Sequence, residues 1–223
     1  TGFSIEDSMW DKILDVIKNR AVDGKYINIL LDVAYIEFAG DGSQKKFFQK
    51  FSSLPENIIT TVAYSMSKSY TAYGLRAGAC IIISSNEDMA NRAFDSMKHS
   101  NRANLSNITH AGMNILVDIE NDEEMKKSYE NELELNRLLL EKRAKVFVKK
   151  AKEIDLIHLP YFGGFFISIP CNNPKEVAKK LKEKDMYIVA NKNGLRFAVC
   201  AVSEEKCEIS PKLIKESIDE VNR

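Results

Sequence analysis

The first half of the chain alternates between helical and strand-like patterns of apolar residues. A helix around Trp10 is followed by short apolar runs at 27–32, 58–64 and 79–83, with a helical stretch at 47–51 after the first run. Runs of this length that are rich in β-branched residues predict buried strands. Strands alternating with helices predict an α/β fold in which a mostly parallel sheet has helices on both faces.

The second half predicts a smaller α+β unit that follows one long helix. Apolar residues spaced by threes, fours and one seven predict that helix over 121–153, and the rest of the segment, mostly Lys, Glu and Arg, is expected to form its solvated face. We expect a large-domain part at 1–125 and a small C-terminal domain at 126–223, bridged by the long helix. The elements predicted after it are a strand at 165–169, a helix at 174–184, and strands near 187–190 and 195–202.

Two helix starts are predicted from local chemistry. Ser4 and Asp7 form an S-x-x-D variant of the capping box, which predicts that the first helix begins there. Pro211 is expected in the first turn of a last helix that runs towards Val221, because proline has no amide hydrogen to lose at that position.

Composition excludes several classes of function. The 223 residues include 32 basic and 32 acidic side chains, and this balance argues against nucleic-acid and anionic-membrane partners. No apolar run approaches the roughly 20 residues needed to span a bilayer, and the first residues are unlike a signal peptide, so a cytoplasmic protein is expected. No metal site is expected, since there is no C-x-x-C, and reduced, mostly buried thiols are predicted for Cys80, Cys171, Cys200 and Cys207.

The segment 65–78 combines hydroxyls, a lysine and an arginine just after a predicted strand. Ser65, Ser67 and Arg76 suit a phosphate, and Lys68 offers an amine nucleophile for carbonyl groups. A polar surface loop that happens to carry a lysine and an arginine is an equally simple interpretation.

Two further residues stand out because charge is expensive to bury. Asp32 ends a predicted buried strand, where it needs a partner such as a protonated ring nitrogen, although a helix cap or a surface charge would also explain it. Arg196 is flanked by apolar residues in a predicted strand, where a substrate carboxylate or an internal acid could pair with it.

Together these motifs resemble the class I pyridoxal-phosphate aminotransferases, in the aspartate and aromatic branch. The matching motifs are D-x-A-Y at 32–35, S-x-S-K at 65–68, Y-G-x-R-x-G at 73–78 and G-L-R-F at 194–197, with a similar segment at 92–107. The resemblance extends over nearly the whole chain. It implies fold type I, the cofactor pyridoxal 5'-phosphate, and a homodimer in the full-length protein.

The resemblance also implies a role for each matched residue. Lys68 would bond covalently to the cofactor, Asp32 would keep the pyridine nitrogen protonated, and Tyr35 would hydrogen-bond the ring oxygen. Ser65, Ser67 and Arg76 would bind the cofactor phosphate. We therefore expect Lys68, Asp32 and Tyr35 to carry the chemistry, with Lys68 moving the proton at the substrate α-carbon.

The resemblance implies amino acid and 2-oxo acid substrates. Arg196 matches the arginine that grips the substrate α-carboxylate. Arg102 matches one that reaches across the dimer to a side-chain carboxylate, and Ser106 would lie near the partner's cofactor. Transamination of aspartate, glutamate or an aromatic amino acid with a 2-oxo acid such as 2-oxoglutarate is expected.

The sequence departs from this family in length. The opening Thr-Gly looks like the end of an Asn-Pro-Thr-Gly motif, so we expect a C-terminal half that has little activity alone and binds the cofactor weakly. The alternative is a non-catalytic module that uses the same fold for ligand sensing or association. The matched Lys68 favours the enzyme, because association alone does not need that amine.

Overall fold

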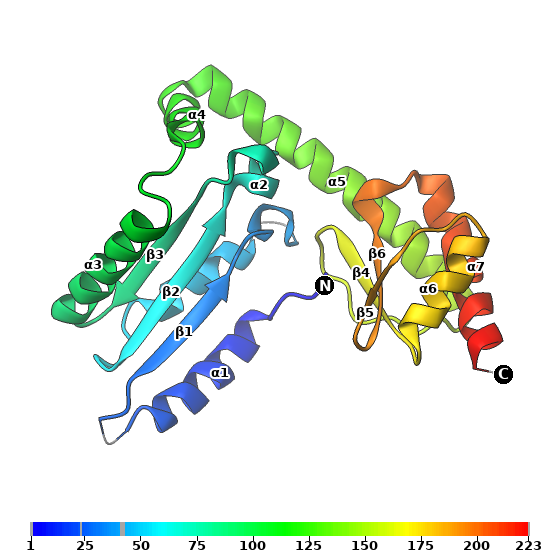
Figure 1. Ribbon diagram of the computed structural model, residues 1–223, viewed down its shortest axis with the longest axis horizontal. Coiled ribbons are helices and arrows are strands. Elements are labelled where there is room, and N and C mark those ends of the chain that lie inside the picture. The colour runs from blue at the N-terminus through cyan, green and yellow to red at the C-terminus, as the bar shows by residue number, and fades with distance from the viewer. Residues whose placement is uncertain (1, 23, 41–42, 223) are drawn as a thin grey trace. The chain divides into compact units, whose positions relative to one another are not determined.

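The computed structural model describes residues 2–22, 24–40 and 43–222, and the chain divides into two compact units (Figure 1). The N-terminal unit comprises Ile5–Glu37 and Asp41–Asn131. The C-terminal unit comprises Thr1–Ser4, Phe38–Gly40 and Glu132–Arg223. Each unit has its own buried apolar cluster, and they are described separately below.

The N-terminal unit contains a sheet in the order β1-β2-β3, made of β1 (Ile27–Asp32), β2 (Ile58–Ser65) and β3 (Gly78–Ser84). The three predicted strands are confirmed. β1 and β2 are parallel, whereas β2 and β3 are antiparallel, so the expectation of a mostly parallel sheet is wrong for this second pair. The short connection between β2 and β3 lacks the crossover that a parallel pair requires.

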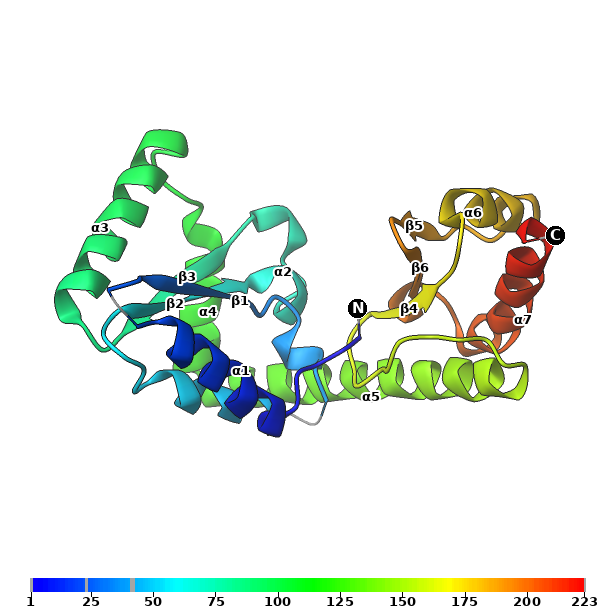
Figure 2. The same ribbon diagram turned by 90° about the horizontal axis from the view of Figure 1, so that it is seen from below.

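Helices pack on this sheet from both sides (Figure 2). α1 (Asp7–Arg20) and the 3₁₀ segment η2 (Ser43–Phe51) bury Leu14 and Phe51 against Ile58 and Val62 of β2. On the other side lies α3 (Glu87–Asn104), which contacts β3. Helices on opposite faces match the expected α/β layering.

Two expectations about this region are wrong. The N-cap of α1 is Glu6, and no side chain caps the helix, so Ser4 does not act as the predicted cap. β1 lies at the sheet edge and buries only Leu31, while Leu30 on the opposite face is 67% exposed. β1 is therefore a half-buried edge strand and not the fully buried strand that its apolar run predicts.

Further helices follow β2 and β3. They are α2 (Met66–Ser69), the 3₁₀ turn η3 (Tyr73–Leu75), α4 (His110–Asn121) and α5 (Glu123–Glu153), with the 3₁₀ turn η1 (Ile36–Phe38) after β1. The side chains of Asn86 and Thr109 cap α3 and α4, for which no helix was predicted. The carboxylate of Asp122 accepts amide hydrogens at the start of α5, which fixes that helix within two residues of its predicted start.

The C-terminal unit has an antiparallel sheet in the order β4-β6-β5, with β4 (Phe166–Pro170), β5 (Val189–Asn191) and β6 (Gly194–Ala198). The 3₁₀ turn η4 (Val199–Ala201) follows β6, and the helices α6 (Pro174–Glu183) and α7 (Glu204–Val221) complete the unit. The predicted α+β character of this segment is confirmed.

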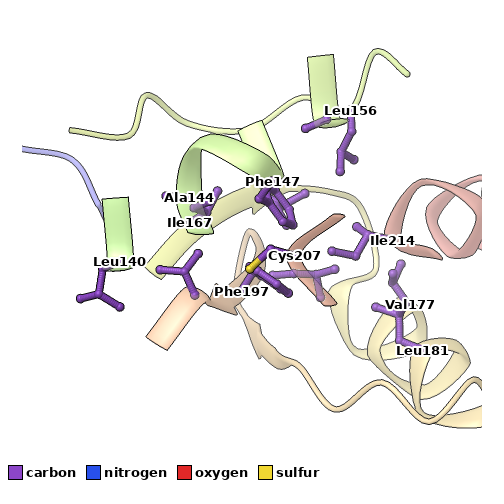
Figure 3. Packing of buried hydrophobic residues seen from close by; sticks show 14 of the residues in the cluster. Leu140, Ala144, Phe147, Leu156, Ile167, Val177, Leu181, Phe197, Cys207 and Ile214 are labelled. Carbon is purple, nitrogen blue, oxygen red and sulfur yellow. The ribbon is translucent and has the colours of Figure 1, made fainter. Parts of the chain in front are cut away.

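The core of this unit lies between one sheet face and the helices (Figure 3). Phe147 of α5 is fully buried and stacks on Phe197 of β6, with ring centroids 4.4 Å apart. The predicted apolar seam of α5 is buried at Leu140, Ala144, Phe147 and Ala151.

Pro211 does not begin the last helix. α7 starts at Glu204, where the hydroxyl of Ser203 accepts the amide hydrogen of Lys206, and Pro211 lies buried inside the helix. A proline within a helix lacks the amide that would bond the preceding turn. The serine cap upstream therefore outweighs the proline as the start signal.

The thiols and charged groups give three further results. All four cysteines are free, but only Cys207 is buried and Cys80 is exposed, so the expectation of mostly buried thiols is wrong. Over the described residues, no cluster of His, Cys, Asp or Glu could hold a metal ion. None of the helices in the described part of the chain combines the length and the apolar character needed to cross a bilayer.

Candidate active site

The predicted chemistry gathers where β1 and β2 end. These strands run parallel with Asp32 opposite Ala63, so the carboxyl ends of both lie at one edge of the sheet. The 32–35 loop leaves β1 there, and α2 with Lys68 continues directly from β2 (Figure 1). Topology alone therefore brings Asp32, Tyr35 and Lys68 to the same edge.

The amine of Lys68 lies between aromatic rings. Its Nζ is 4.8 Å from the ring centre of Tyr35 and 5.6 Å from that of Tyr73. The side chain is half-buried, and no carboxylate of a described residue forms an ion pair with it. An ammonium group over aromatic faces is held by the ring quadrupole without being neutralised. Lys68 therefore presents an amine that no internal acid occupies.

One hydroxyl of the 65–68 motif, that of Ser65, makes a hydrogen bond to the local backbone. Ser65 is the N-cap of α2, and its Oγ accepts the amide hydrogen of Ser67 over 3.2 Å. Ser67 itself is buried. Because the Ser65 cap uses only one lone pair, its hydroxyl hydrogen remains available to an anion.

Arg76 lies in a strained position of the same loop. Its φ is 53°, in the left-handed region that non-glycine residues rarely adopt, and Thr71 shares this feature with a φ of 51°. One guanidinium nitrogen donates to the carbonyl of Tyr73 over 2.9 Å. The remaining donors of this exposed side chain have no partner among the residues described, and they suit a phosphate.

Asp32 is exposed, which agrees with the surface-charge alternative and not with a carboxylate buried at a strand end. Its Oδ1 accepts the amide hydrogen of Ala34 over 3.1 Å, and this short turn directs the chain towards Tyr35. No cation among the described side chains pairs with Asp32. The carboxylate is therefore free to accept a further donor.

Arg102, in the last turn of α3, forms a pair with Ser106, which follows the helix. The Arg102 guanidinium donates to the Ser106 hydroxyl over 2.6 Å, and Ser106 has a left-handed φ of 65°. Both side chains are exposed. Their predicted roles concern a second copy of the chain and stay predictions.

Arg196 belongs to the C-terminal unit, on the sheet face opposite the core. Its neighbours Leu195 and Phe197 are buried, and Arg196 lies 4.4 Å from the ring centre of Phe166 on β4. Arg196 pairs with Ser168 across the strands, so Phe166 is its diagonal neighbour on the same face. The Nε of Arg196 is buried and has no hydrogen-bond partner among the described atoms, so it is available as a donor to an anion.

Three residues near these groups were not predicted from the sequence. Tyr73 contacts Lys68, and Tyr129 of α5 stacks on Tyr70, which follows α2, with ring centroids 4.7 Å apart. Their aromatic character was visible, but only tertiary packing shows which ring meets which. Arg143 of α5, the third, donates to the carbonyls of Val199 and Cys200, just after the strand that carries Arg196.

Burial raises the pKa values of three tyrosines near α2. Desolvation is the largest cause for Tyr64, Tyr70 and Tyr129, and it raises the pKa of Tyr70 to about 12. All three therefore remain protonated, and able to donate a hydrogen bond, at neutral pH.

The donor set fits pyridoxal phosphate. The cofactor carries an aldehyde, a phosphate and a ring nitrogen, and the N-terminal unit offers an amine, a guanidinium with hydroxyls, and a free carboxylate at one sheet edge. In the other unit, the buried and unpaired Nε of Arg196 fits a substrate carboxylate.

Comparison with known proteins agrees with this arrangement. The family described as aminotransferase class I and II matches residues 1–210. The aspartate aminotransferase of Escherichia coli K12 is 30% identical over 167 residues, which cover 73% of this chain and 41% of that protein.

Solved structures show the same fold. An aminotransferase from Anaerococcus prevotii matches with a TM-score of 0.93 and 46% identity, covering 100% of this chain and 54% of that one. The aromatic-amino-acid aminotransferase of Burkholderia pseudomallei, covalently bound to pyridoxal phosphate, matches with a TM-score of 0.75 and 24% identity over 98% of this chain and 53% of that one. The chain thus spans about half the length of these relatives. It belongs to the aminotransferase class I and II family.

Proposed function

We propose that this chain is the C-terminal part of a pyridoxal-phosphate-dependent aminotransferase. The substrates would be aspartate, glutamate or an aromatic amino acid together with a 2-oxo acid such as 2-oxoglutarate. One observation carries the proposal: the Lys68 amine lies over the Tyr35 ring, without an acidic partner in the described chain, at the sheet edge where Asp32 ends β1.

In this proposal, six residues of the N-terminal unit hold the cofactor. Lys68 provides the amine for covalent attachment. Asp32 accepts the hydrogen of the protonated ring nitrogen, and Tyr35 donates to the ring oxygen. Ser65, Ser67 and Arg76 bind the phosphate, which the unused donors of Arg76 support.

The substrate contacts are assigned to two arginines. Arg196 binds the α-carboxylate, and its buried Nε, unpaired among the described atoms, supports this role. Arg102 would reach a side-chain carboxylate bound by a second subunit of a homodimer, and Ser106 would lie near that subunit's cofactor. The 2.6 Å bond between Arg102 and Ser106 keeps the two together at the end of α3.

When bound, pyridoxal phosphate supplies an aldehyde and a conjugated ring that accepts electrons. The Lys68 amine would carry the proton away from the substrate α-carbon and return it, as general base and then acid. Asp32 holds the proton at the ring nitrogen. Arg196 orients the substrate by a bidentate contact, which selects the bond at the α-carbon that reacts.

We further propose that residues 1–125 form part of the cofactor-binding large domain of fold type I and that 126–223 form the small domain. The structural units divide at Asn131, within α5, which supports a boundary inside this helix. A cytoplasmic homodimer is the expected setting, with neither nucleic acid nor membrane as partner.

The chain alone should bind the cofactor weakly and turn over slowly. Asp32 and Arg76 are both exposed, and exposed charges attract a ligand less strongly than shielded ones do. β1 is also an edge strand of the sheet, and an exposed sheet edge favours association of the isolated chain.

A chimera tests the activity directly. This chain would replace the matching 54% of the Anaerococcus prevotii aminotransferase, to which it is 46% identical. We expect amino transfer from aspartate or an aromatic amino acid to 2-oxoglutarate, abolished by Lys68→Ala and lowered by Arg196→Ala. Arg102→Leu should depress turnover of dicarboxylates more than that of aromatic amino acids.

The matched control is Lys46→Ala, which removes an exposed lysine of the same unit and should leave turnover unchanged. A folded chimera that binds the cofactor on Lys68 but transfers no amino group would favour the non-catalytic sensing module. A chimera whose activity survives Lys68→Ala would contradict the assignment of Lys68.

A further inference from the structure

The helix that carries Lys68 is too short to hold itself in place. α2 spans only Met66–Ser69, and a single helical turn is not stable in isolation because nucleation costs more than one turn returns. The loop that follows contains the left-handed Thr71. The direction of the Lys68 side chain must therefore be fixed by contacts with other elements.

The start of α2 is held by local contacts. Ser65 caps its first turn, and Met66 is buried beside α4. At Gly112 of α4, an added Cβ would lie 2.6 Å from the Cβ of Ala77 and 3.4 Å from the sulfur of Met66. α4 therefore packs closely against the N-terminal side of α2. The C-terminal side of α2 must be held by other elements.

The carbonyl groups at the end of α2 accept hydrogen bonds from backbone amides and from one side chain. Backbone amides of Tyr70 and Thr71 bond the carbonyls of Met66 and Lys68, respectively. The carbonyl of Ser69 instead accepts the hydroxyl hydrogen of Tyr129, over 3.3 Å. Tyr129 lies near the start of α5, sixty residues further along the chain. A residue distant in sequence thus satisfies a helix-end carbonyl one residue after Lys68.

The ring of Tyr129 makes a second contact at the same place. It stacks on the ring of Tyr70 with centroids 4.7 Å apart and an interplanar angle of 4°. Burial keeps Tyr129 protonated far above neutral pH by raising its pKa, so the hydroxyl remains a donor under all ordinary conditions. Tyr129 therefore contacts both Ser69 and Tyr70, which lie on the C-terminal side of Lys68.

We propose that Tyr129 is a positioning residue for Lys68, which holds the end of α2 so that the amine stays over the Tyr35 ring. This inference rests on the proposed function only in that Lys68 is the cofactor-binding amine; the contact itself is independent of any cofactor. Tyr129 touches neither cofactor nor substrate in this account and acts through the backbone of α2.

Two variants separate the hydroxyl from the ring. Tyr129→Phe removes the donor to Ser69 and keeps the stack on Tyr70, whereas Tyr129→Leu removes both. Tyr26→Phe is the matched control, because Tyr26 belongs to the same unit and is 77% exposed. Each variant of the 223-residue chain is compared with the wild type.

Two readouts report on Lys68 itself. The first is the reactivity of each lysine towards a trace of acetic anhydride without cofactor, mapped by peptide mass spectrometry. The second is the rate at which borohydride traps pyridoxal phosphate on Lys68. Losing one hydrogen bond should change both by about fivefold for Tyr129→Phe, in line with the net strength of such a bond, and by more for Tyr129→Leu. The other lysines should be unaffected.

The outcomes distinguish the two claims. A change confined to Lys68 in Tyr129→Phe, absent in Tyr26→Phe, supports the positioning role, also when Tyr129→Leu fails to fold. Unchanged Lys68 reactivity and trapping in a folded Tyr129→Phe overturns it. If wild-type Lys68 is never trapped by the cofactor but its acetylation still responds to Tyr129→Phe, the positioning role stands and the proposed function fails.

Discussion

The amine of Lys68 lies 4.8 Å from the ring centre of Tyr35, although the two residues follow different strands. The parallel pairing of β1 with β2 brings them together, because parallel neighbours end at the same edge. Tyr35 and Lys68 therefore meet at the edge of the sheet where the cofactor aldehyde is proposed to bind.

Replacing Tyr35 should weaken cofactor attachment. Tyr35→Leu removes a ring contact worth about 0.5–2 kcal/mol to a cation, together with the hydroxyl proposed to bind the cofactor oxygen. We expect the apparent affinity for pyridoxal phosphate, measured by borohydride trapping at increasing concentration, to fall at least about threefold. Tyr35→Phe keeps the ring and should give a smaller loss. Equal affinity of Tyr35→Leu and wild type would contradict the contact.

Arg76 should account for recognition of the phosphate. Charge-assisted hydrogen bonds contribute about 1.5–3 kcal/mol, so Arg76→Ala should reduce the preference for pyridoxal phosphate over pyridoxal by about tenfold or more. Arg76→Lys controls for backbone strain, because both substituted side chains must adopt the same left-handed φ of 53°. The measurement is the ratio of the two affinities, and an unchanged ratio in Arg76→Ala would refute the assignment.

Phe147 should dominate the stability of the C-terminal unit. Its side chain is 0% exposed and stacks on Phe197, so Phe147→Ala leaves a cavity that the surrounding helices cannot fill. We expect the free energy of unfolding to fall by about 3–5 kcal/mol, measured by urea denaturation. Leu138→Ala on the same helix removes a side chain that is 46% exposed and should cost far less. A similar loss of unfolding free energy in both variants would contradict the burial of Phe147 in this core.

High pH should destabilise the N-terminal unit through its buried tyrosines. Burial raises the pKa of Tyr70 from 10.0 to about 12, so the folded state keeps a proton that the unfolded chain releases. The resulting stability is complete below pH 10, declines above it, and is lost as pH rises through about 12. Tyr70→Phe should flatten this decline in urea denaturation over that range. A wild-type titration of tyrosinate absorbance without a component near pH 12 would contradict the burial.

Much of the fold could be predicted from the pattern of apolar residues. The strand runs before Asp32 and Ser65 and the seam through Phe147 indicated their elements correctly, because burial imposes a period on the sequence. The antiparallel direction of β3 and the exposure of Leu30 could not be predicted, since both depend on which strands are neighbours. The prediction that Pro211 lies in the first turn of the last helix was wrong, because Ser203 further upstream caps this helix and fixes its start.

The candidate site was predictable where one short segment contains it. The Lys68 and Arg76 motif is local, so its spacing was readable from the chain. The contact of Tyr129 with Ser69 joins residues sixty positions apart, and no local pattern indicates it. The burial of the Arg196 Nε without a hydrogen-bond partner among the described atoms likewise depends on how the strands around it pack.

Covalent attachment to Lys68 tests the central claim most directly. The chain is incubated with pyridoxal phosphate until trapping saturates, reduced with borohydride, and digested for peptide mass spectrometry. We predict one stoichiometric adduct on Lys68, absent from Lys68→Arg and weakened in Asp32→Asn. Modification spread evenly over surface lysines, with Lys68 no more reactive than the exposed Lys46, would contradict it.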